Sequence, residues 1–296
     1  MINSGWSRQE SPFHAGELAV QNKLGVRDRT DRQGRRMIRE YLTEQHQQFF
    51  AQLTYLVIGT VDKIGNPWSS IVLGEPGFIQ VLSDRKLQIE TQILAGDPLA
   101  NNLEVGANLG ILGIELHTRR RNRVNGVVSA IRGDRIEIAV QQTFGNCPQY
   151  IQPRELETKD FSDHNKIEPL TTLNQITQDL ITQADTFFIS TAYQNDSQDM
   201  SQGVDVSHRG GKPGFVRIDS ARTLTIPDYS GNNHFNTIGN LELNSRAGLL
   251  FIDFATSNLL YLTGTTEIIW SGEELASFEN AQRLIRFSLE QGFYSH

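Results

Sequence analysis

The chain has 296 residues, with 34 aspartates and glutamates against 27 lysines and arginines, so its formal net charge is −7. This negative charge disfavours the phosphate backbone of nucleic acids as a partner, and the length allows one large or two modest cores without covalent staples. The single cysteine, Cys147, excludes disulfide frameworks, zinc ribbons and iron–sulfur clusters.

The first half of the chain predicts a leading helix followed by short antiparallel strands. Apolar residues spaced three and four apart over residues 32–52 indicate an amphipathic helix, interrupted near Thr43. Residues 53–74 form a hairpin pattern, with β-branched runs on both sides of a turn at 63–67. Further strands are expected at 77–82, 87–91, 109–116, 125–132 and 135–143. A helix with many short strands is typical of an α+β or barrel protein.

The second half repeats this order at a nearly constant offset. Phe78 and Phe215 close two Pro-Gly-Phe tripeptides 137 residues apart, in segments (76–81 and 213–218) that both read as strands. Gly110 and Gly248 stand 138 residues apart, and so do the glycines at 126 and 264. The constant offset predicts two copies of one β-rich unit, whereas a chance match between two β-rich halves is the alternative.

The same patterns divide the chain into four parts. We expect an N-terminal arm over 1–31, a first barrel with its leading helix over 32–152, a polar connector over 153–176 and a second barrel over 177–296. Strands are expected at 184–193 and 247–253, and the period-two pattern of 283–290 predicts the strand that closes the second copy.

The common catalytic motifs are missing. Residues 209–212 resemble a phosphate loop, but Val206 stands where GxxxxGK needs its first glycine. There is no GxGxxG after a strand, no HExxH on a helix and no GxSxG elbow. The seven histidines show no pair at ligand spacing, so no metal site is predicted and the catalytic residues stay unknown.

Two polar, glycine-rich segments, 205–215 and 226–240, predict an anion site in the second copy. Both fall at expected strand ends, where backbone N–H groups, hydroxyls, amides, Arg209 and Lys212 can converge. A phosphate dianion suits such donors, because charge-assisted hydrogen bonds contribute roughly 1.5 to 3 kcal/mol each where water is partly excluded. A glycine-rich loop with solvated polar residues is the alternative.

The first copy differs at the corresponding places and predicts no phosphate site, since it carries apolar residues and the acidic Asp97 there. Trp68 offers an aromatic face to a planar ligand, or packs in a hairpin or core. The arginines of 119–123 read as a phosphate clamp or as a solvated, salt-bridged turn, and the acidic chain favours the turn. For Cys147 we expect a structural role, since a reactive thiol needs special surroundings.

Seven segments of the chain resemble, in order, the tandem-barrel branch of the pyridoxamine 5′-phosphate oxidase-like FMN-binding split-barrel superfamily. The resemblance runs from about Phe13 to the C-terminal strand. It implies a mainly β protein with flanking helices, built as two tandem six-stranded Greek-key split β-barrels, with FMN bound where two barrels meet. The segments are GNPWSS, GEPGF, GIELHTRRRNR, NG, FGNCPQYIQ, SHRGGKPGF and SGNNHFNTIGNLELN.

The resemblance also implies cofactor-binding residues. Amides stand where relatives place arginine or lysine against the flavin phosphate, which leaves Arg209 and Lys212 as the obvious cations, while Trp68 or its neighbouring backbone faces the flavin ring. The cofactor-binding residues implied in this way are Ser207, His208, Arg209, Lys212, Asn232, Asn233, Asn236, Thr237 and Trp68.

The function that the resemblance implies is an FMN-binding flavoprotein, an oxidoreductase of unknown substrate, electron donor and acceptor. The alternative is a non-catalytic module that holds flavin or haem, with His208 or His234 as the first candidates for an axial ligand. We expect a cytoplasmic protein without nucleic-acid or membrane partners, because the sequence shows no membrane-length apolar run and no signal-peptide pattern. A monomer and a homodimer are both compatible with the sequence.

Overall fold

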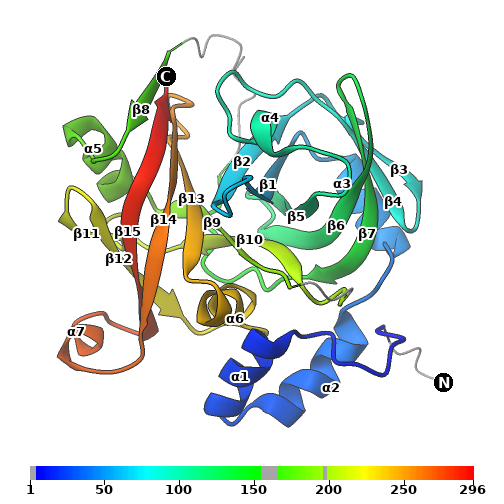
Figure 1. Ribbon diagram of the computed structural model, residues 1–296, viewed down its shortest axis with the longest axis horizontal. Helices are drawn as coiled ribbons and strands as arrows, with labels where there is room; N and C mark the ends of the chain where they lie inside the picture. Colours follow the sequence, from blue (N-terminus) through cyan, green and yellow to red (C-terminus); the bar gives the residue numbers. More distant parts are fainter. Residues whose placement is uncertain (1–4, 155–165, 196–198) are drawn as a thin grey trace.

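The computed structural model describes residues 5–154, 166–195 and 199–296, and its main feature is a pair of antiparallel sheets (Figure 1). The first sheet has seven strands in the order β2-β1-β5-β6-β7-β4-β3. Its strands are β1 (Tyr55–Val61), β2 (Pro67–Leu73), β3 (Ile79–Ser83), β4 (Lys86–Glu90), β5 (Asn108–Glu115), β6 (Arg120–Arg132) and β7 (Arg135–Gly145).

The second sheet repeats the first strand for strand, in the order β10-β9-β13-β14-β15-β12-β11, and adds β8 beside β15. This repetition confirms the two copies that the constant offset predicts. Each curled sheet has seven strands in the common order, one more than the expected six. The strands are β8 (Ile167–Leu170), β9 (Thr186–Tyr193), β10 (Gly203–Gly210), β11 (Arg217–Ser220), β12 (Thr223–Tyr229), β13 (Arg246–Ile252), β14 (Leu259–Ile269) and β15 (Ala281–Ser295).

Helices lie at the ends and edges of the sheets, and none in the described residues is long and apolar enough to cross a membrane. The helix expected over 32–52 is interrupted, as predicted, because the Thr43 side chain accepts a hydrogen bond from the His46 N–H and begins a new helix. The helices are α1 (Ala15–Lys23), α2 (Arg27–Met37), α3 (Glu44–Ala51), α4 (Leu99–Asn102), α5 (Gln175–Gln183), α6 (Asn236–Leu243) and α7 (Glu273–Ala276).

One expected strand begins later than the sequence predicts. Residues 213–216 form a turn and β11 starts only at Arg217. The reason is local: Gly214 has φ +83°, and the Phe215 N–H donates to the Lys212 carbonyl at 3.0 Å. Parts of the expected arm and connector, residues 1–4 and 155–165, lie outside the described residues.

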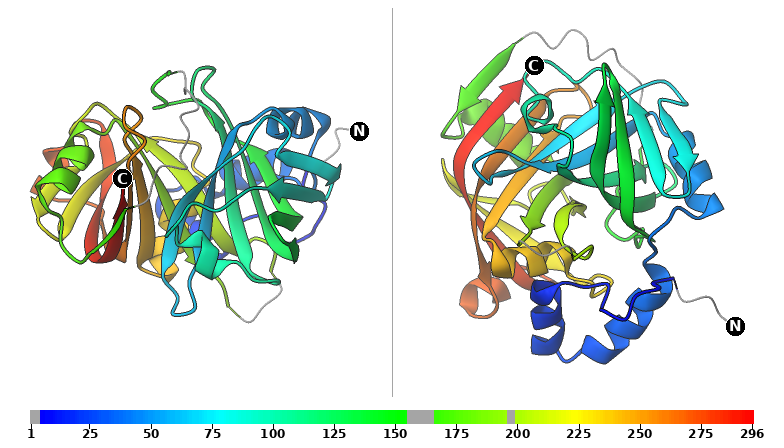
Figure 2. Two further views of the ribbon diagram at one scale, coloured as in Figure 1. Left: turned by 90° about the horizontal axis from the view of Figure 1, so that it is seen from above. Right: turned by 45° about the vertical axis from the view of Figure 1, so that its right-hand side comes forward.

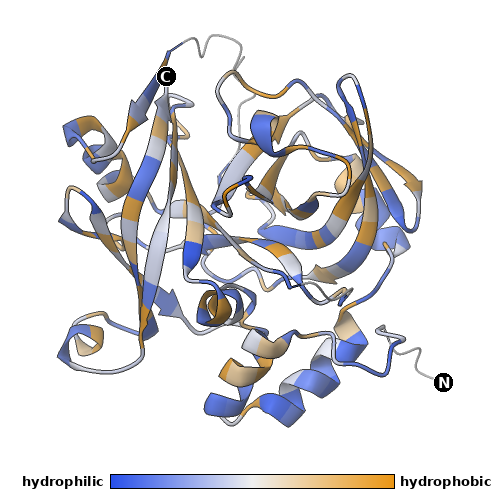
Figure 3. Cartoon of the chain, viewed as in Figure 1, coloured by the Kyte–Doolittle hydropathy of each residue, from blue (hydrophilic) through white to orange (hydrophobic). Residues whose placement is uncertain are grey.

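Each sheet encloses its own apolar core, and a third apolar cluster joins the two. Along β7 the apolar residues Ile136, Ile138 and Val140 recur at every second position, as a strand with one buried face requires (Figure 3). The third cluster draws Trp68 and Leu112 from the first sheet and Phe188 and Leu250 from the second. The two barrels therefore form one packed body (Figure 2).

Two glycines bring the barrels into backbone contact at equivalent places. A Cβ on Gly110 of β5 would lie 2.5 Å from the Val204 carbonyl oxygen on β10. A Cβ on Gly248 of β13 would lie 2.6 Å from the Cα of Trp68 on β2. Because Gly110 and Gly248 occupy the same position in the two copies, the barrels are related by an approximate two-fold axis, which creates two equivalent clefts along their seam.

The N-terminal helices reach across to the second barrel. Helix α1 packs on α6 so closely that Cβ atoms on Gly16 and Gly239 would each collide with the other helix's backbone. Glu17 is buried beneath this contact and accepts hydrogen bonds from the Asn236 amide and, at 2.9 Å, from the His14 N–H. Burial raises the pKa of Glu17 well above its usual range, and nearby Asp205 acts in the same direction.

Candidate functional site

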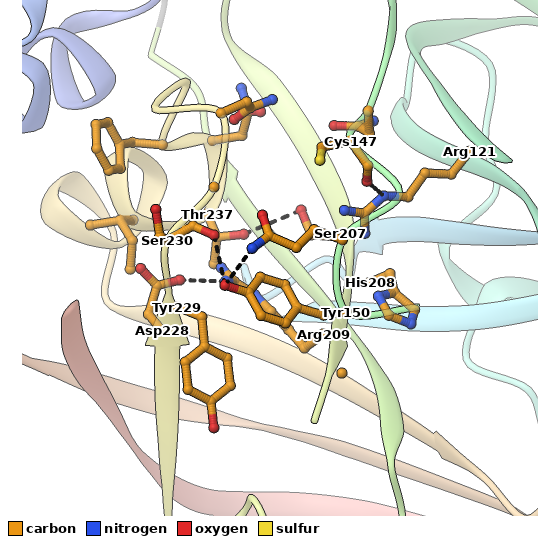
Figure 4. A pocket seen from close by; sticks show the side chains of 18 of the residues that line it. Arg121, Cys147, Tyr150, Ser207, His208, Arg209, Asp228, Tyr229, Ser230 and Thr237 are labelled. Carbon is orange, nitrogen blue, oxygen red and sulfur yellow. Dashed lines mark hydrogen bonds and ion pairs between the residues drawn. The ribbon is translucent and has the colours of Figure 1, made fainter. Parts of the chain in front are cut away.

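A polar pocket lies at the seam of the barrels, between β10, the loop that leads into α6, and the segment that follows β7 (Figure 4). The cavity itself measures about 130 Å³ and opens to solvent at its mouth. Both barrels contribute walls, so the pocket exists only when they are packed together.

Most of the residues predicted from the sequence meet in this pocket. Seven of the nine line it, from two stretches that are separated in the chain by β11 and β12: Ser207, His208, Arg209, Asn232, Asn233, Asn236 and Thr237. Their convergence gives the pocket hydroxyl, amide, imidazole and guanidinium groups on one wall.

Trp68 and Lys212 are not in the pocket. Trp68 is 3% exposed, packs 5.5 Å from the Phe293 ring and donates its Nε1–H to Asp62, so it belongs to the core between the barrels. Lys212 follows the end of β10 at Gly210 and is exposed. Neither residue is therefore among those that line this pocket.

The N-terminus of α6 faces the pocket and supplies backbone donors. Asn236, Thr237 and Ile238 form the first turn and all line the cavity. Their N–H groups have no acceptor within the helix, and no side chain caps this end. Asn233 and Phe235 adopt left-handed backbone, both with φ of 63°, to bring the chain into this turn. A helix start of this kind favours an anion.

Arg209 takes part in a buried ion cluster at the base of the pocket. Its guanidinium pairs with Asp228, whose other oxygen lies 3.2 Å from Nη1 of Arg283. Asp228 and Arg283 are 5% and 4% exposed. One carboxylate therefore serves two guanidinium groups, and the cluster keeps a positive charge beside the cavity.

The first barrel adds two arginines that the sequence reading had placed in a solvated turn, which was wrong. Strand β6 begins at Arg120, so Arg121 and Arg123 lie on the same face of an extended chain and point toward the second barrel. Arg123 is 3% exposed and donates to Asp205 at 2.6 Å and to Ser207 Oγ at 2.5 Å. The period-two spacing of these arginines, which continues to Asn125, was the signal that could have revealed them.

Arg121 is the cation least compensated by protein groups. Its Nε–H donates to the Cys147 carbonyl at 2.8 Å, and no carboxylate in the described part of the chain pairs with it. Burial lowers the pKa of Arg121 to about 10, and the neighbouring charges of Arg123 and Arg209 act in the same direction. Asp205 pairs with Arg123, and Asp228 is shared by Arg209 and Arg283. The surplus positive charge of the pocket therefore comes from Arg121 and from the sharing of Asp228.

His208 is buried in the pocket without hydrogen-bond partners. It is 5% exposed, and neither ring nitrogen has a partner among the described residues. Burial lowers the pKa of His208 well below its usual value, and Arg121, Arg209 and Arg154 reinforce the shift. A neutral imidazole is therefore the stable form, with one donor and one acceptor left for a ligand.

The chain after β7 forms the mouth of the pocket, which sequence reasoning did not anticipate. Tyr150 stacks on Tyr229 with ring centroids 5.2 Å apart, and its hydroxyl donates to the Ser230 carbonyl at 3.1 Å. Gly210 is needed here, because a Cβ would collide with the Tyr150 carbonyl. Cys147 lies at the same rim with an exposed thiol.

The equivalent cleft in the first copy is filled by protein side chains. Tyr261, which stands 138 residues after Arg123, donates to the buried Asp97 carboxylate at 2.9 Å. Asp97 also accepts from the Leu99 N–H at 2.8 Å, and the Ile167 side chain packs against Gly96. Tyr261 and Asp97 thus occupy the place in the first copy that corresponds to the Arg123 side of the pocket.

The Asp97 contact gives a testable pH dependence. Burial raises the pKa of Asp97 from 3.8 to about 6, so between these values the folded chain binds more protons than the unfolded chain. The free energy of unfolding should therefore fall by about 3 kcal/mol from this group as pH rises through that window. In Asp97→Asn this component should vanish when chemical unfolding is followed between about pH 4 and pH 7. Parallel pH curves for the two proteins would contradict the assignment.

Comparisons with known proteins show which proteins this chain is similar to. A family model for pyridoxamine 5′-phosphate oxidase matches residues 173–291, and no curated protein matches the chain. The chain is similar in structure to HupZ of Group A Streptococcus, with 16% identity and a TM-score of 0.33 over 40% of this chain and 91% of that one. A putative pyridoxamine 5′-phosphate oxidase from Lactobacillus delbrueckii has 12% identity and a TM-score of 0.32 over 42% and 94%.

An FAD-binding protein from Mesorhizobium loti has 11% identity and a TM-score of 0.26 over 44% of this chain and 99% of that one. Each of these structures covers less than half of the chain. The family match lies on the second sheet. The second barrel is therefore similar to pyridoxamine 5′-phosphate oxidase over residues 173–291, and the first barrel repeats its strand order.

Proposed function

We propose that the pocket at the seam binds FMN and that the protein is an FMN-dependent oxidoreductase. The observation that carries the proposal is the surplus of buried positive charge beside the start of α6, together with donors that lack acceptors. Arg209 Nε, Asn146 Nδ2 and His208 have no hydrogen-bond partner among the described residues. Leaving such groups unpaired is costly, so the residues present fit an anionic ligand rich in acceptors.

The two ends of the pocket suit the two parts of FMN. The backbone donors of α6, Thr237 and Arg209 would hold the phosphate, and Arg121 would add a cation from the first barrel. The stacked rings of Tyr150 and Tyr229 and the apolar atoms of Ile238 offer surface to the planar ring system. In this proposal Arg121 takes the role expected of Lys212 at the phosphate, and Tyr150 and Tyr229 take the role expected of Trp68 at the flavin ring.

The chain's own residues would bind and orient the cofactor rather than carry the chemistry. Arg123 donates to Ser207 Oγ, and so does the Thr237 hydroxyl at 3.3 Å, so the Ser207 proton is left for a ligand. His208 stays neutral, and Asp228 is committed to two arginines. When bound, FMN supplies the electron-transfer chemistry through its isoalloxazine ring.

Asp228 is paired with two arginines and so is not free to act as an acid or base, which favours one second candidate function, a non-catalytic flavin-binding module. No other carboxylate lines the described pocket, so an acid or base of ordinary acidity is missing from it. Haem is a weaker fit for His234, whose ring is enclosed between Phe13 and Phe144 at 5.2 and 5.6 Å. Steady oxidation of NADH or NADPH with an added acceptor separates an oxidoreductase from a flavin-holding module.

The absorption spectrum of the protein tests flavin binding itself. The protein is measured as purified and again after incubation with excess FMN and desalting. We expect flavin bands that survive desalting, because charged hydrogen bonds and ring stacking both act on FMN. A spectrum of protein alone under both conditions would refute the proposal. A Soret band would show that the protein binds haem instead.

A further inference from the structure

Cys147 occupies a defined place at the rim of the pocket. Its carbonyl accepts from Arg121 Nε–H at 2.8 Å, and the Asn146 N–H donates to the Arg121 carbonyl at 3.1 Å. These two contacts fix the segment after β7 against the start of β6. The thiol is exposed, lines the cavity and lies near the Arg121 side chain (Figure 4).

A second, independent feature shows what kind of molecule can reach this thiol. His208 is 5% exposed, is one of the residues that line the same cavity, and has no partner for either ring nitrogen among the described residues. The Asn146 amide nitrogen is also without a partner there. Both groups call for a small guest with hydrogen-bond acceptors close to Cys147.

Charge selects further among such guests. Asp205 pairs with Arg123 and Asp228 is shared by Arg209 and Arg283, while Arg121 has no carboxylate partner among the described residues. The pocket is therefore positive, although the whole chain has a net charge of −7. A cavity of one sign raises the local concentration of opposite charge and the rate of encounter, by roughly 10- to 1,000-fold in favourable cases. Carboxylate-bearing molecules should therefore be concentrated beside the thiol, and cationic ones excluded.

We propose that Cys147 is a redox-modification site selective for anionic, low-molecular-weight disulfides. The deprotonated Cys147 sulfur attacks one sulfur of the disulfide, the old S–S bond breaks, and the second half leaves as a thiolate. The thiol proton passes to solvent, and the new mixed disulfide retains the oxidising equivalents of the old one. The carboxylate of the bound half pairs with Arg121, and the adduct obstructs the mouth of the pocket.

The first test compares two disulfides of opposite charge, the dianionic 5,5′-dithiobis(2-nitrobenzoate) and the dicationic cystamine. A peptide with the sequence of residues 143–152 serves as the reference, because it has the same Cys-Pro context and no charged side chain. We expect the ratio of the anionic to the cationic rate to be at least ~10 times higher in the folded protein than in the peptide. Salt at about 0.5 M should reduce this excess strongly. Equal ratios in protein and peptide would overturn the proposal.

Variants locate the effect in the pocket. Arg121→Gln should lower the rate ratio about fivefold, whereas Arg132→Gln, which removes a 74% exposed guanidinium on the same strand, should leave it unchanged. Cys147→Ser supplies the blank. Inorganic phosphate should slow the anionic reagent in the wild-type protein and not in the peptide. If Arg132→Gln lowers the ratio as much as Arg121→Gln does, overall charge is responsible and the proposal fails.

These kinetics are measured without flavin, so they stand or fall separately from FMN binding. The result remains decisive even if Arg121→Gln unfolds, because the wild-type ratio, its salt dependence and phosphate protection do not require the variant. A mixed disulfide that forms at the peptide's rate and is insensitive to phosphate would show an ordinary surface cysteine.

Discussion

Replacing both Arg121 and Arg209 by glutamine is expected to weaken FMN binding at least ~100-fold, since each charged hydrogen bond contributes roughly 1.5 to 3 kcal/mol. The two arginines reach the pocket from different barrels, and the double variant removes both cations that lack a full carboxylate partner of their own. Glutamine keeps a polar side chain of similar reach, so the loss reports charge. Each single variant should lose about tenfold.

The matched measurement uses riboflavin, which lacks the phosphate. We expect the wild-type protein to prefer FMN over riboflavin, and the double variant to lose that preference while its riboflavin affinity changes by less than about threefold. Arg132→Gln is the control, because that side chain is 74% exposed. An equal loss of affinity for both flavins would mean that the pocket had been distorted, and an unchanged preference would remove the arginines from the phosphate site.

Gly248→Ala is expected to destabilise the protein by about 3 kcal/mol, because overpacking a rigid core costs roughly 1 to 3 kcal/mol and the obstruction here is backbone. The added Cβ would lie 2.6 Å from the Cα of Trp68 and would also meet the Pro67 carbonyl. Since neither atom can move without displacing β2, the two barrels must separate. The pocket at their seam should open with them, so ligand affinity should fall together with stability.

Gly231→Ala is the control for this variant. A Cβ at Gly231 meets nothing within 4 Å and its φ is ordinary, so its unfolding free energy should stay within about 0.5 kcal/mol of the wild type. Gly110→Ala, at the equivalent position of the first copy, should resemble Gly248→Ala. Denaturant unfolding measures all three, and a Gly248→Ala protein as stable as the control would refute the close seam.

Much of the fold could be predicted because its signals are local. Strand periodicity, the turn chemistry at 63–67 and the spacing of Gly110 and Gly248 require only neighbours or a repeated pattern. The late start of β11 shows the limit of such signals. Pro213 and Gly214 stand within an apolar pattern that reads as a strand, but the positive φ of the glycine turns the chain instead.

The residues that the second barrel contributes to the site could also be predicted from the sequence, because polar residues at strand ends tend to lie close together. The first-barrel wall was not, since Arg121 and Arg123 acquire their surroundings only when the barrels pack. Trp68 shows the converse: its exposure depends on Phe293, more than 200 residues away, which covers it. No local pattern predicts the contact between α1 and α6 either. Gly16 and Gly239 are required only because the two helices pack against each other there.

Equilibrium dialysis of the purified protein against FMN tests the central claim most directly. With one seam cleft lined by cations and the other filled by Tyr261 and Asp97, the account predicts about one FMN per chain. The bound flavin should be displaced by inorganic phosphate at high concentration. Two FMN per chain would show that the filled cleft also binds, and no saturable binding would contradict the account as a whole.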